Sequence, residues 1–251
     1  MTFWRECFIV FRRQLRMNLR NPAWVIIGML QPVLYLLLFA PLLKPLVPRL
    51  GAVNAYTFFV PGLLVQLGIF GAFFAGFSLI GEWREGVIEA ERVTPASRTA
   101  LLVGRLGRDL LQLLVQALIL VVLGAALGMD APLSGVTVGI LLTLGIGGAC
   151  AAASNALALT TKSEDVMAPV INMVMMPVLL LSGILLPMTI GPSWLRRTSD
   201  FMPTRWVVDG VRSAFGGHLG ASGVLWGTVW TGILLAVALW WGTATFRREN
   251  A

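Results

Sequence analysis

The side chains that could carry out chemistry in this 251-residue chain are few and widely spaced. The one histidine, His218, lies among glycines, with no residues at metal-ligand spacing around it. A phosphate-binding loop of the Walker type needs a Gly-Lys pair, and neither Lys44 nor Lys162 follows a glycine. The apolar stretches also lack the clustered Asp, His or Ser-Lys sets that an intramembrane enzyme requires. We therefore expect no catalysis, no ATP hydrolysis and no cofactor or metal on this chain itself.

The two cysteines are not expected to form a disulfide. Cys7 lies in a basic N-terminal segment and Cys150 lies inside an apolar run, so they would sit at different depths in a membrane. Both are predicted to be inert thiols.

The elements that must position any functional residue are membrane helices. The chain is 57% hydrophobic and 12% charged, against about 25% charged in a typical soluble domain. Each of its uncharged runs can cover a hydrocarbon core of about 30 Å, and only helices satisfy the backbone of an isolated span. We predict an all-α polytopic membrane protein with six transmembrane helices, in the runs 21–43, 50–81, 110–129, 131–161, 166–195 and 219–246.

The positions of the charges indicate an orientation. The net charge of +7 could signal nucleic-acid binding, but the charges cluster between the apolar runs, as expected beside anionic headgroups. No nucleic-acid partner is therefore expected. With both termini in the cytoplasm, thirteen of the 19 cations fall on the inner side: Arg5, Arg12, Arg13, Arg16, Arg20, Arg84, Arg92, Arg98, Arg105, Arg108, Lys162, Arg247 and Arg248. The chain is predicted to be a multi-pass protein of the plasma membrane.

Residues 1–21 are predicted to form an amphipathic helix on the inner membrane surface. Apolar residues recur there at three- and four-residue spacing, and the arginines fall on another face. A simple topology signal is the alternative interpretation. Asn21-Pro22 should end the helix, because the residue before proline is pushed out of the helical region.

Residues 82–98 form the most charged connection between two spans. Acidic and basic residues alternate in it, which suits a short helix on the cytoplasmic face that offers a docking surface. A solvated loop is the alternative. The candidate coupling residues are Glu82, Arg84, Glu85, Gly86, Glu89, Arg92 and Pro95.

Residues 188–217 are predicted to form short re-entrant helices in the outer leaflet, before the last span. Pro203 fits the first turn of such a helix. Arg205, Asp209 and Arg212 follow at i, i+4 and i+7 and could pair along one face. A plain surface loop remains the alternative.

Two spans offer candidate substrate contacts. An aromatic face in the second span and flexible, partly polar side chains in the fifth suit a lipophilic or ring-bearing compound. Lipid contact or helix packing is the alternative for both. The candidate substrate-path residues are Phe70, Phe73, Phe74, Phe77, Asn172, Met173 and Met176.

Four motifs, taken in order, carry a family resemblance. They are Phe11-Arg12-Arg13 with Arg20-Asn21-Pro22-Ala23-Trp24, the run from Leu30-Gln31-Pro32 to Phe39, the run Glu82-Trp83-Arg84-Glu85-Gly86 leading to Pro95, and Met202-Pro203-Thr204-Arg205-Trp206 leading to Arg212. From end to end, the chain resembles an ABC-2 type exporter permease, close to the daunorubicin-resistance permeases of bacteria. Met202, Thr204 and Asp209 depart from the family pattern, which often has Asn, Leu and Glu at these positions.

The resemblance implies one transmembrane domain over residues 1–251 and an assembly of two permease subunits, expected to be a homodimer, with two cytoplasmic ABC ATPase subunits that hold ATP and Mg²⁺. It also implies that residues 82–97 are the coupling helix and that the N-terminal helix helps to dock the ATPase. The expected function is export of an amphiphilic or lipophilic, drug- or antibiotic-like compound from a bacterial cell. Export of a lipid or lipid-linked glycan is the alternative substrate class, and a gradient-driven transporter or membrane anchor is the alternative function.

Overall fold

The computed structural model describes residues 3–20, 23–45, 54–88, 98–185 and 187–248. These residues form helices joined by short connections, and no strand occurs among them. The helices are α1 (Phe3–Arg20), α2 (Ala23–Leu43), α3 (Ala55–Phe73), α4 (Ala75–Arg84), α6 (Arg98–Ala126), α7 (Leu133–Thr161), α8 (Glu164–Leu181), η2 (Met188–Ile190), α9 (Ser193–Asp200), α10 (Pro203–Phe215) and α11 (Ser222–Arg248).

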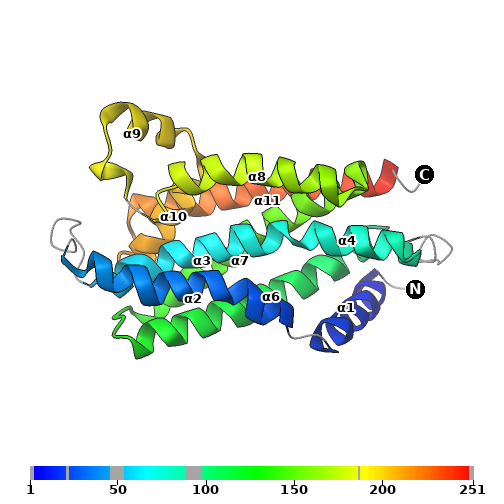
Figure 1. Cartoon of the computed structure of the whole chain (residues 1–251), viewed down its shortest axis with the longest axis horizontal. Coiled ribbons are helices and arrows are strands. Elements are labelled where there is room, and N and C mark those ends of the chain that lie inside the picture. The colour runs from blue at the N-terminus through cyan, green and yellow to red at the C-terminus, as the bar shows by residue number, and fades with distance from the viewer. Residues whose placement is uncertain (1–2, 21–22, 46–53, 89–97, 186, 249–251) are drawn as a thin grey trace.

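The long helices lie side by side in an elongated bundle, and α1 lies at one end, inclined to them and packed against α6 (Figure 1). The N-terminus and the last turn of α11 share this end, which we call the N/C end. Helix α9 projects from the opposite end, called the α9 end. His218 precedes α11 at the α9 end, so the last helix runs the length of the bundle.

Among the described residues, five helical stretches are long and apolar enough to cross a membrane: Ala55–Arg84, which comprises α3 and α4, Thr99–Ala126, Leu133–Thr161, Glu164–Leu181 and Ser222–Phe246. A shorter apolar helix, Ile26–Leu42, lies within α2. The predicted all-helical polytopic membrane fold is confirmed. The fifth apolar run was expected to continue to residue 195, but its helix ends at Leu181, where Ser182 and Gly183 form a turn and Gly183 takes a positive φ of 74°. Glycine adopts that conformation without a steric cost.

Helix α7 is the centre of the bundle, packed against α3, α4, α6, α10 and α11. Small residues allow this close approach: a Cβ on Gly145 would lie 2.4 Å from Thr231 of α11, and a Cβ on Gly147 would lie 2.3 Å from Leu113 of α6. Helix α3 is buried almost continuously from Phe59 to Ile69. Interfaces rich in small residues are what membrane helices use to pack when lipid offers no hydrophobic driving force.

Helix α1 packs against α6. A Cβ on Gly104 would meet Val10 at 2.7 Å, and a Cβ on Gly107 would meet the Phe11 ring at 3.2 Å. Cys7 is buried, and this burial raises the pKa of its thiol, which disfavours the reactive thiolate. The predicted apolar face is divided, because Cys7 lies inward whereas Trp4 and Phe8 are exposed.

Candidate functional site at the N/C end

The N/C end of the bundle contains a buried ion pair. Glu82, in the last turn of α4, accepts a bond from Arg105 of α6, with 2.8 Å between Oε2 and Nη2. The side chains are only 8% and 3% exposed. Such a pair is favourable only when further hydrogen bonds satisfy both groups, so its surroundings matter.

Helix α1 supplies a further bond to Glu82, and the next turn of α6 extends the network. Gln14 Nε2 donates to Glu82 Oε1 at 2.8 Å, and Arg108 Nη1 donates to Gln14 Oε1 at 2.9 Å. Arg108 also donates to Ser78 Oγ of α4 at 3.1 Å and forms an ion pair with Asp109. We call these six residues the Glu82 cluster: Gln14, Ser78, Glu82, Arg105, Arg108 and Asp109.

The Glu82 cluster joins three helices that are far apart in the sequence. Gln14 and Glu82 are separated by 68 residues, and Arg108 and Gln14 by 94. The formal charges of its two arginines and two carboxylates balance. Because a hydrogen-bonded charge pair is costly to break in a low-dielectric environment, the cluster should hold α1, α4 and α6 in one fixed arrangement.

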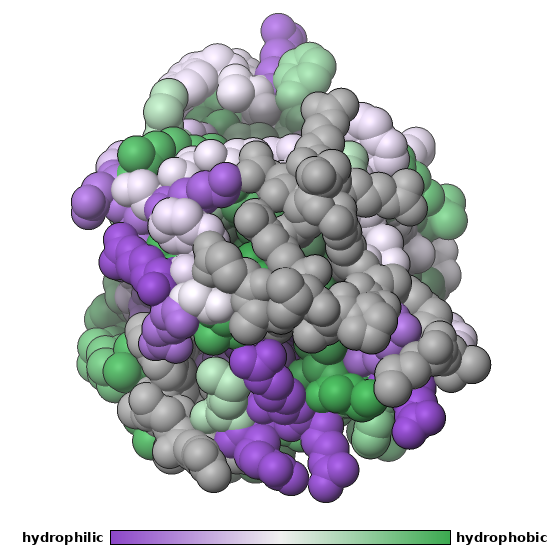
Figure 2. All heavy atoms as spheres, turned by 90° about the vertical axis from the view of Figure 1, so that its right-hand side faces the viewer, coloured by the Kyte–Doolittle hydropathy of each residue, from purple (hydrophilic) through white to green (hydrophobic). Residues whose placement is uncertain are grey.

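The end of α4 next to the cluster is solvent-accessible. Gly86 terminates the helix with a φ of 73°, and its N–H donates to the Trp83 carbonyl. Arg84 forms a 3.0 Å ion pair with Glu164 at the start of α8, and both side chains are about half exposed. Figure 2 looks onto this end and shows hydrophilic residues gathered around it. Charged side chains here are available to another protein.

The predicted coupling residues fall into three groups. Glu82 is buried in the cluster, whereas Arg84 and Glu85 are exposed and Gly86 is half-buried. Glu89, Arg92 and Pro95 lie outside the described residues. Whether these residues contact a partner stays a prediction, but Glu82 is turned toward its own chain.

Sequence reasoning missed Gln14, Ser78, Arg108 and Asp109 as members of this site. A signal was present in the spacing of Arg105, Arg108 and Asp109, which places them on one face of a helix at i, i+3 and i+4. Gln14 carried no such signal. It is a neutral residue among arginines, and the arginines alone accounted for the predicted role of its segment.

The candidate aromatic path meets an interruption of its helix. Phe70 and Phe73 belong to α3 and Phe77 belongs to α4, and all three pack partly buried against the core. Phe74 lies at the break between the two helices and is 56% exposed. The predicted single aromatic face assumed a continuous helix, and this break divides it.

The fifth-span candidates are on the outer surface of the bundle. Asn172, Met173 and Met176 are exposed on α8, Met173 to 81%, whereas Met175 is buried. Helix α8 therefore presents a long apolar surface to lipid or to another polypeptide.

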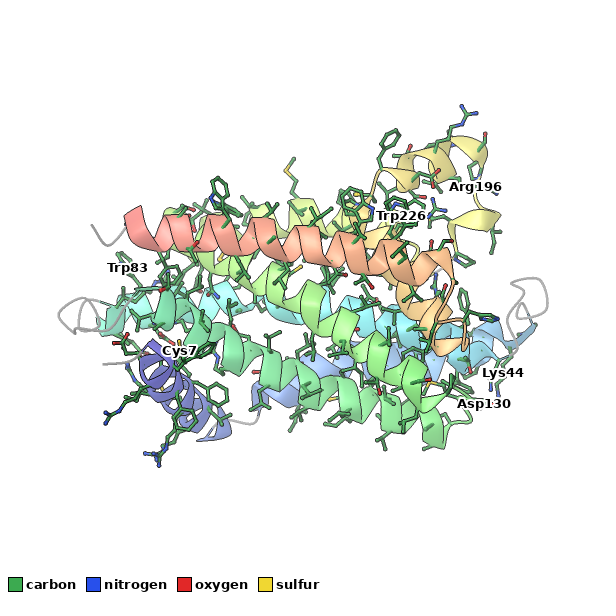
Figure 3. All side chains as sticks on the ribbon, turned by 180° about the vertical axis from the view of Figure 1, so that it is seen from behind. Cys7, Lys44, Trp83, Asp130, Arg196 and Trp226 are labelled. Atoms are coloured by element: carbon green, nitrogen blue, oxygen red, sulfur yellow. The ribbon has the colours of Figure 1, made fainter. Side chains whose placement is uncertain are left out.

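A second charged group lies at the α9 end. Arg205 of α10 bonds to Asp200 and, at 3.6 Å, to Asp209, so the predicted i, i+4 pair is present. Arg212 turns inward instead: it donates to the Ile184 carbonyl at 2.9 Å and lies 4.2 Å from the Phe58 ring centre. Figure 3 shows Asp130, Lys44 and Arg196 at this end, opposite Cys7 and Trp83. Helix α10 begins at Pro203, as predicted.

Metal chemistry finds no support in the part of the chain that the structure describes. No three His, Cys, Asp or Glu side chains there form a group that could hold a metal ion. The buried charges are arranged to bond to one another.

These features define a polytopic helical membrane protein with a charged, partly accessible surface at one end, an arrangement typical of a transport subunit. A family model described as "ABC-2 type transporter" matches residues 5–215. The chain belongs to this family and is a membrane component of a transporter.

Two relatives agree with this assignment, both named "Putative transport permease ycf38". The one from Cyanophora paradoxa is 29% identical over 218 residues, which cover 84% of this chain and 74% of the relative. The one from Porphyra purpurea is 26% identical over 202 residues, covering 77% and 68%. ABC-2 type permeases work with an ABC ATPase, which the described features of this chain leave to a partner.

Proposed function

We propose that this chain is the permease subunit of an ABC exporter that moves an amphiphilic or lipophilic, drug- or antibiotic-like compound out of a bacterial cell. The energy comes from ATP hydrolysed, with Mg²⁺, on a separate subunit, and this chain is not catalytic. The observation that carries the proposal is the Glu82 cluster, because it joins α1, α4 and α6 beside an exposed charged surface.

The arrangement supports a specific route for coupling. A force on the exposed end of α4 reaches Glu82 within one helical turn, and Glu82 is bonded to both α1 and α6. Arg84 passes the same force to α8 through Glu164. A partner that binds at the N/C end would therefore move four helices together.

Positive charge supports the orientation of the chain. Both termini lie at the N/C end, where α1 contributes Arg5, Arg12, Arg13 and Arg16. Arginines remain preferentially on the cytoplasmic side of a membrane. We place the N/C end in the cytoplasm of a bacterial cell and the α9 end outside.

The exposed face of α8 supports a second permease copy as a further partner. Val166, Val170, Met173, Met176 and Leu180 are all exposed and follow helical spacing. In a homodimer, this face of α8 would pack against the second copy of the chain. Membrane lipid would cover the exposed parts of α2 and α11. The candidate substrate contacts remain Phe70, Phe73, Phe74, Phe77, Asn172, Met173 and Met176.

Partner binding tests the proposal directly. The chain is purified from its native host with a mild detergent, and a Walker-containing ATPase subunit is expected to co-purify with it. Glu85→Lys, Glu89→Lys and Arg92→Glu should each reduce ATPase recovery, because truncation or reversal of an interfacial charge costs about 2–5 kcal/mol when the pair is buried. Asp130→Lys is the matched control, since Asp130 is an exposed acid at the α9 end.

The outcomes separate the alternatives. A gradient-driven carrier would be recovered without an ATPase, which contradicts the proposal. Equal losses for Glu89→Lys and Asp130→Lys would mean that the 82–98 segment has no special part in docking.

A further inference from the structure

Helices α3 and α4 would form one helix across the membrane if their hydrogen-bond ladder were not interrupted at Phe74. The Phe77 N–H donates to the Phe74 carbonyl, three residues back, at 3.1 Å, and this leaves the Phe73 carbonyl without its usual partner. The Ser154 hydroxyl of α7 donates to that carbonyl and accepts a bond from the Gly76 N–H at 3.1 Å. A side chain inserted into the ladder is a recognised cause of a helix kink.

The site of this insertion is tightly closed. Ser154 and Met167 of α8 have no exposed surface, and a Cβ on Gly76 would overlap both of them. Three helices, α4, α7 and α8, therefore meet around a main-chain gap that a single hydroxyl fills. The Phe73 carbonyl and the Gly76 N–H, which the interruption frees, are hydrogen-bonded inside the protein, as burial in a membrane requires.

The two halves of the interrupted helix have different attachments. Helix α3 is buried in the core and is held at the α9 end, where Thr57 exchanges hydrogen bonds with the main chain of Asp130. Helix α4 is bonded at the N/C end to the rest of the Glu82 cluster and to Glu164. Between these regions, the chain passes through the break at Phe74.

We propose that Ser154 is a positioning residue for transport, whose hydroxyl forms a pivot at which α4 moves with the partner ATPase while α3 stays fixed in the core. This inference rests on the proposed function. Phe74 and Phe77 lie at the pivot with their ring centres 5.7 Å apart, so movement of α4 changes the aromatic contacts first. The bond from Ser154 keeps the break satisfied as α4 moves.

Distances between spin labels test the movement in the complex of permease and ATPase, compared without nucleotide and trapped with ADP and vanadate. Labels at Asp130→Cys and Gly81→Cys report across the break, since a Cβ on Gly81 meets no atom within 4 Å. Labels at Asp130→Cys and Thr160→Cys report along the continuous helix α7. Cys7 and Cys150 are replaced by Ser and Ala. We expect the first distance to change by about 2 Å or more and the second to stay constant. A first distance that stays constant on trapping would show that α3 and α4 move as one rigid helix and would overturn the inference.

Removal of the hydroxyl tests the role of Ser154 itself. Ser154→Ala should abolish the nucleotide-dependent change across the break. Thr143→Val is the matched control: Thr143 is equally buried on α7, but its hydroxyl bonds only to Gly139 of its own helix. A Ser154→Ala complex with the same change as the unmodified one would show that the hydroxyl does not position the pivot.

Hydrogen exchange gives a measure that needs no ATPase. In the permease alone in lipid nanodiscs, the amides of residues 76–79 should exchange faster than those of residues 64–68, and Ser154→Ala should accelerate residues 76–79 by about tenfold. Unchanged exchange in Ser154→Ala would overturn the pivot. Failure of an ATPase to co-purify would instead contradict the proposed function, so the two failures are distinguishable.

Discussion

Two arginines turn inward at opposite ends of this bundle, Arg105 buried and Arg212 half-buried, and they are held in different ways. Arg105, at the N/C end, faces a carboxylate from another helix, and that carboxylate is bonded to a third helix. Arg212, at the α9 end, faces a main-chain carbonyl and the face of an aromatic ring. The first arrangement joins helices through opposite charges, whereas the second attaches a short helix to its neighbours through a hydrogen bond and a ring.

This difference indicates that the two ends of the bundle are stabilised by different kinds of interaction. Charges that hold each other in place also transmit displacement, because moving one leaves the other uncompensated. Arg212 is held by a carbonyl and a ring, and its neighbouring carboxylate, Asp209, belongs to the same helix and is 42% exposed. The N/C end therefore joins α1, α4 and α6, whereas the contacts of Arg212 at the α9 end attach α10 to its neighbours.

The largest expected effect is removal of one charge from the Glu82 cluster. Arg105→Met leaves Glu82 buried with the 2.8 Å hydrogen bond from Gln14, and breaking a buried pair in this way costs about 3–5 kcal/mol. The midpoint of thermal unfolding in detergent measures the loss. The double variant Glu82→Gln, Arg105→Met should recover most of it, because no uncompensated charge remains. A double variant as unstable as the single one would contradict the charge-based account.

A smaller effect is expected at the α9 end. Arg212→Met removes the hydrogen bond to Ile184 and the contact with Phe58, but it leaves no partner carboxylate buried alone. The expected loss is about 1.5–3 kcal/mol, the range for hydrogen bonds to charged groups. The same unfolding measurement applies. A loss that equals or exceeds that of Arg105→Met would break the comparison between the two ends.

The smallest effect is expected for the exposed pair at the N/C end. Arg84 and Glu164 are 54% and 42% exposed, and surface ion pairs contribute about 0–1 kcal/mol. Arg84→Ala should therefore leave the unfolding midpoint nearly unchanged while it weakens the connection from α4 to α8. The ATPase activity of the partner subunit in the complex, measured together with the unfolding midpoint, separates these two effects. A large fall in stability would show that this pair belongs to the structural cluster.

Much of the fold was accessible to prediction because it depends on local properties. Long uncharged runs predicted membrane helices, since the backbone must be satisfied within each span. Pro203 predicted the first turn of α10, whereas Asn21-Pro22, predicted to end α1, lies outside the described residues. The i, i+4 pair of Arg205 and Asp209 followed from helical spacing alone.

The candidate site was only partly accessible. The sequence indicated that residues 82–98 and the N-terminal helix form a surface for docking. It also suggested that the Glu82 side chain faces outward and that the second span is one continuous helix. The structure buries Glu82 and interrupts the span at Phe74. Both features depend on partners from distant helices, Arg105 with Gln14 in one case and Ser154 in the other.

By itself, the sequence determined that this protein lies in a membrane as a helical bundle with its charges at the ends, because composition sets the solvent that each segment prefers. Only the tertiary structure decided which charges face one another and where a helix is broken. A buried ion pair and an inserted hydroxyl require atoms within about 3 Å, brought together from segments up to 94 residues apart. No local pattern encodes such a distance, since it results from how α1, α4, α6 and α7 pack together.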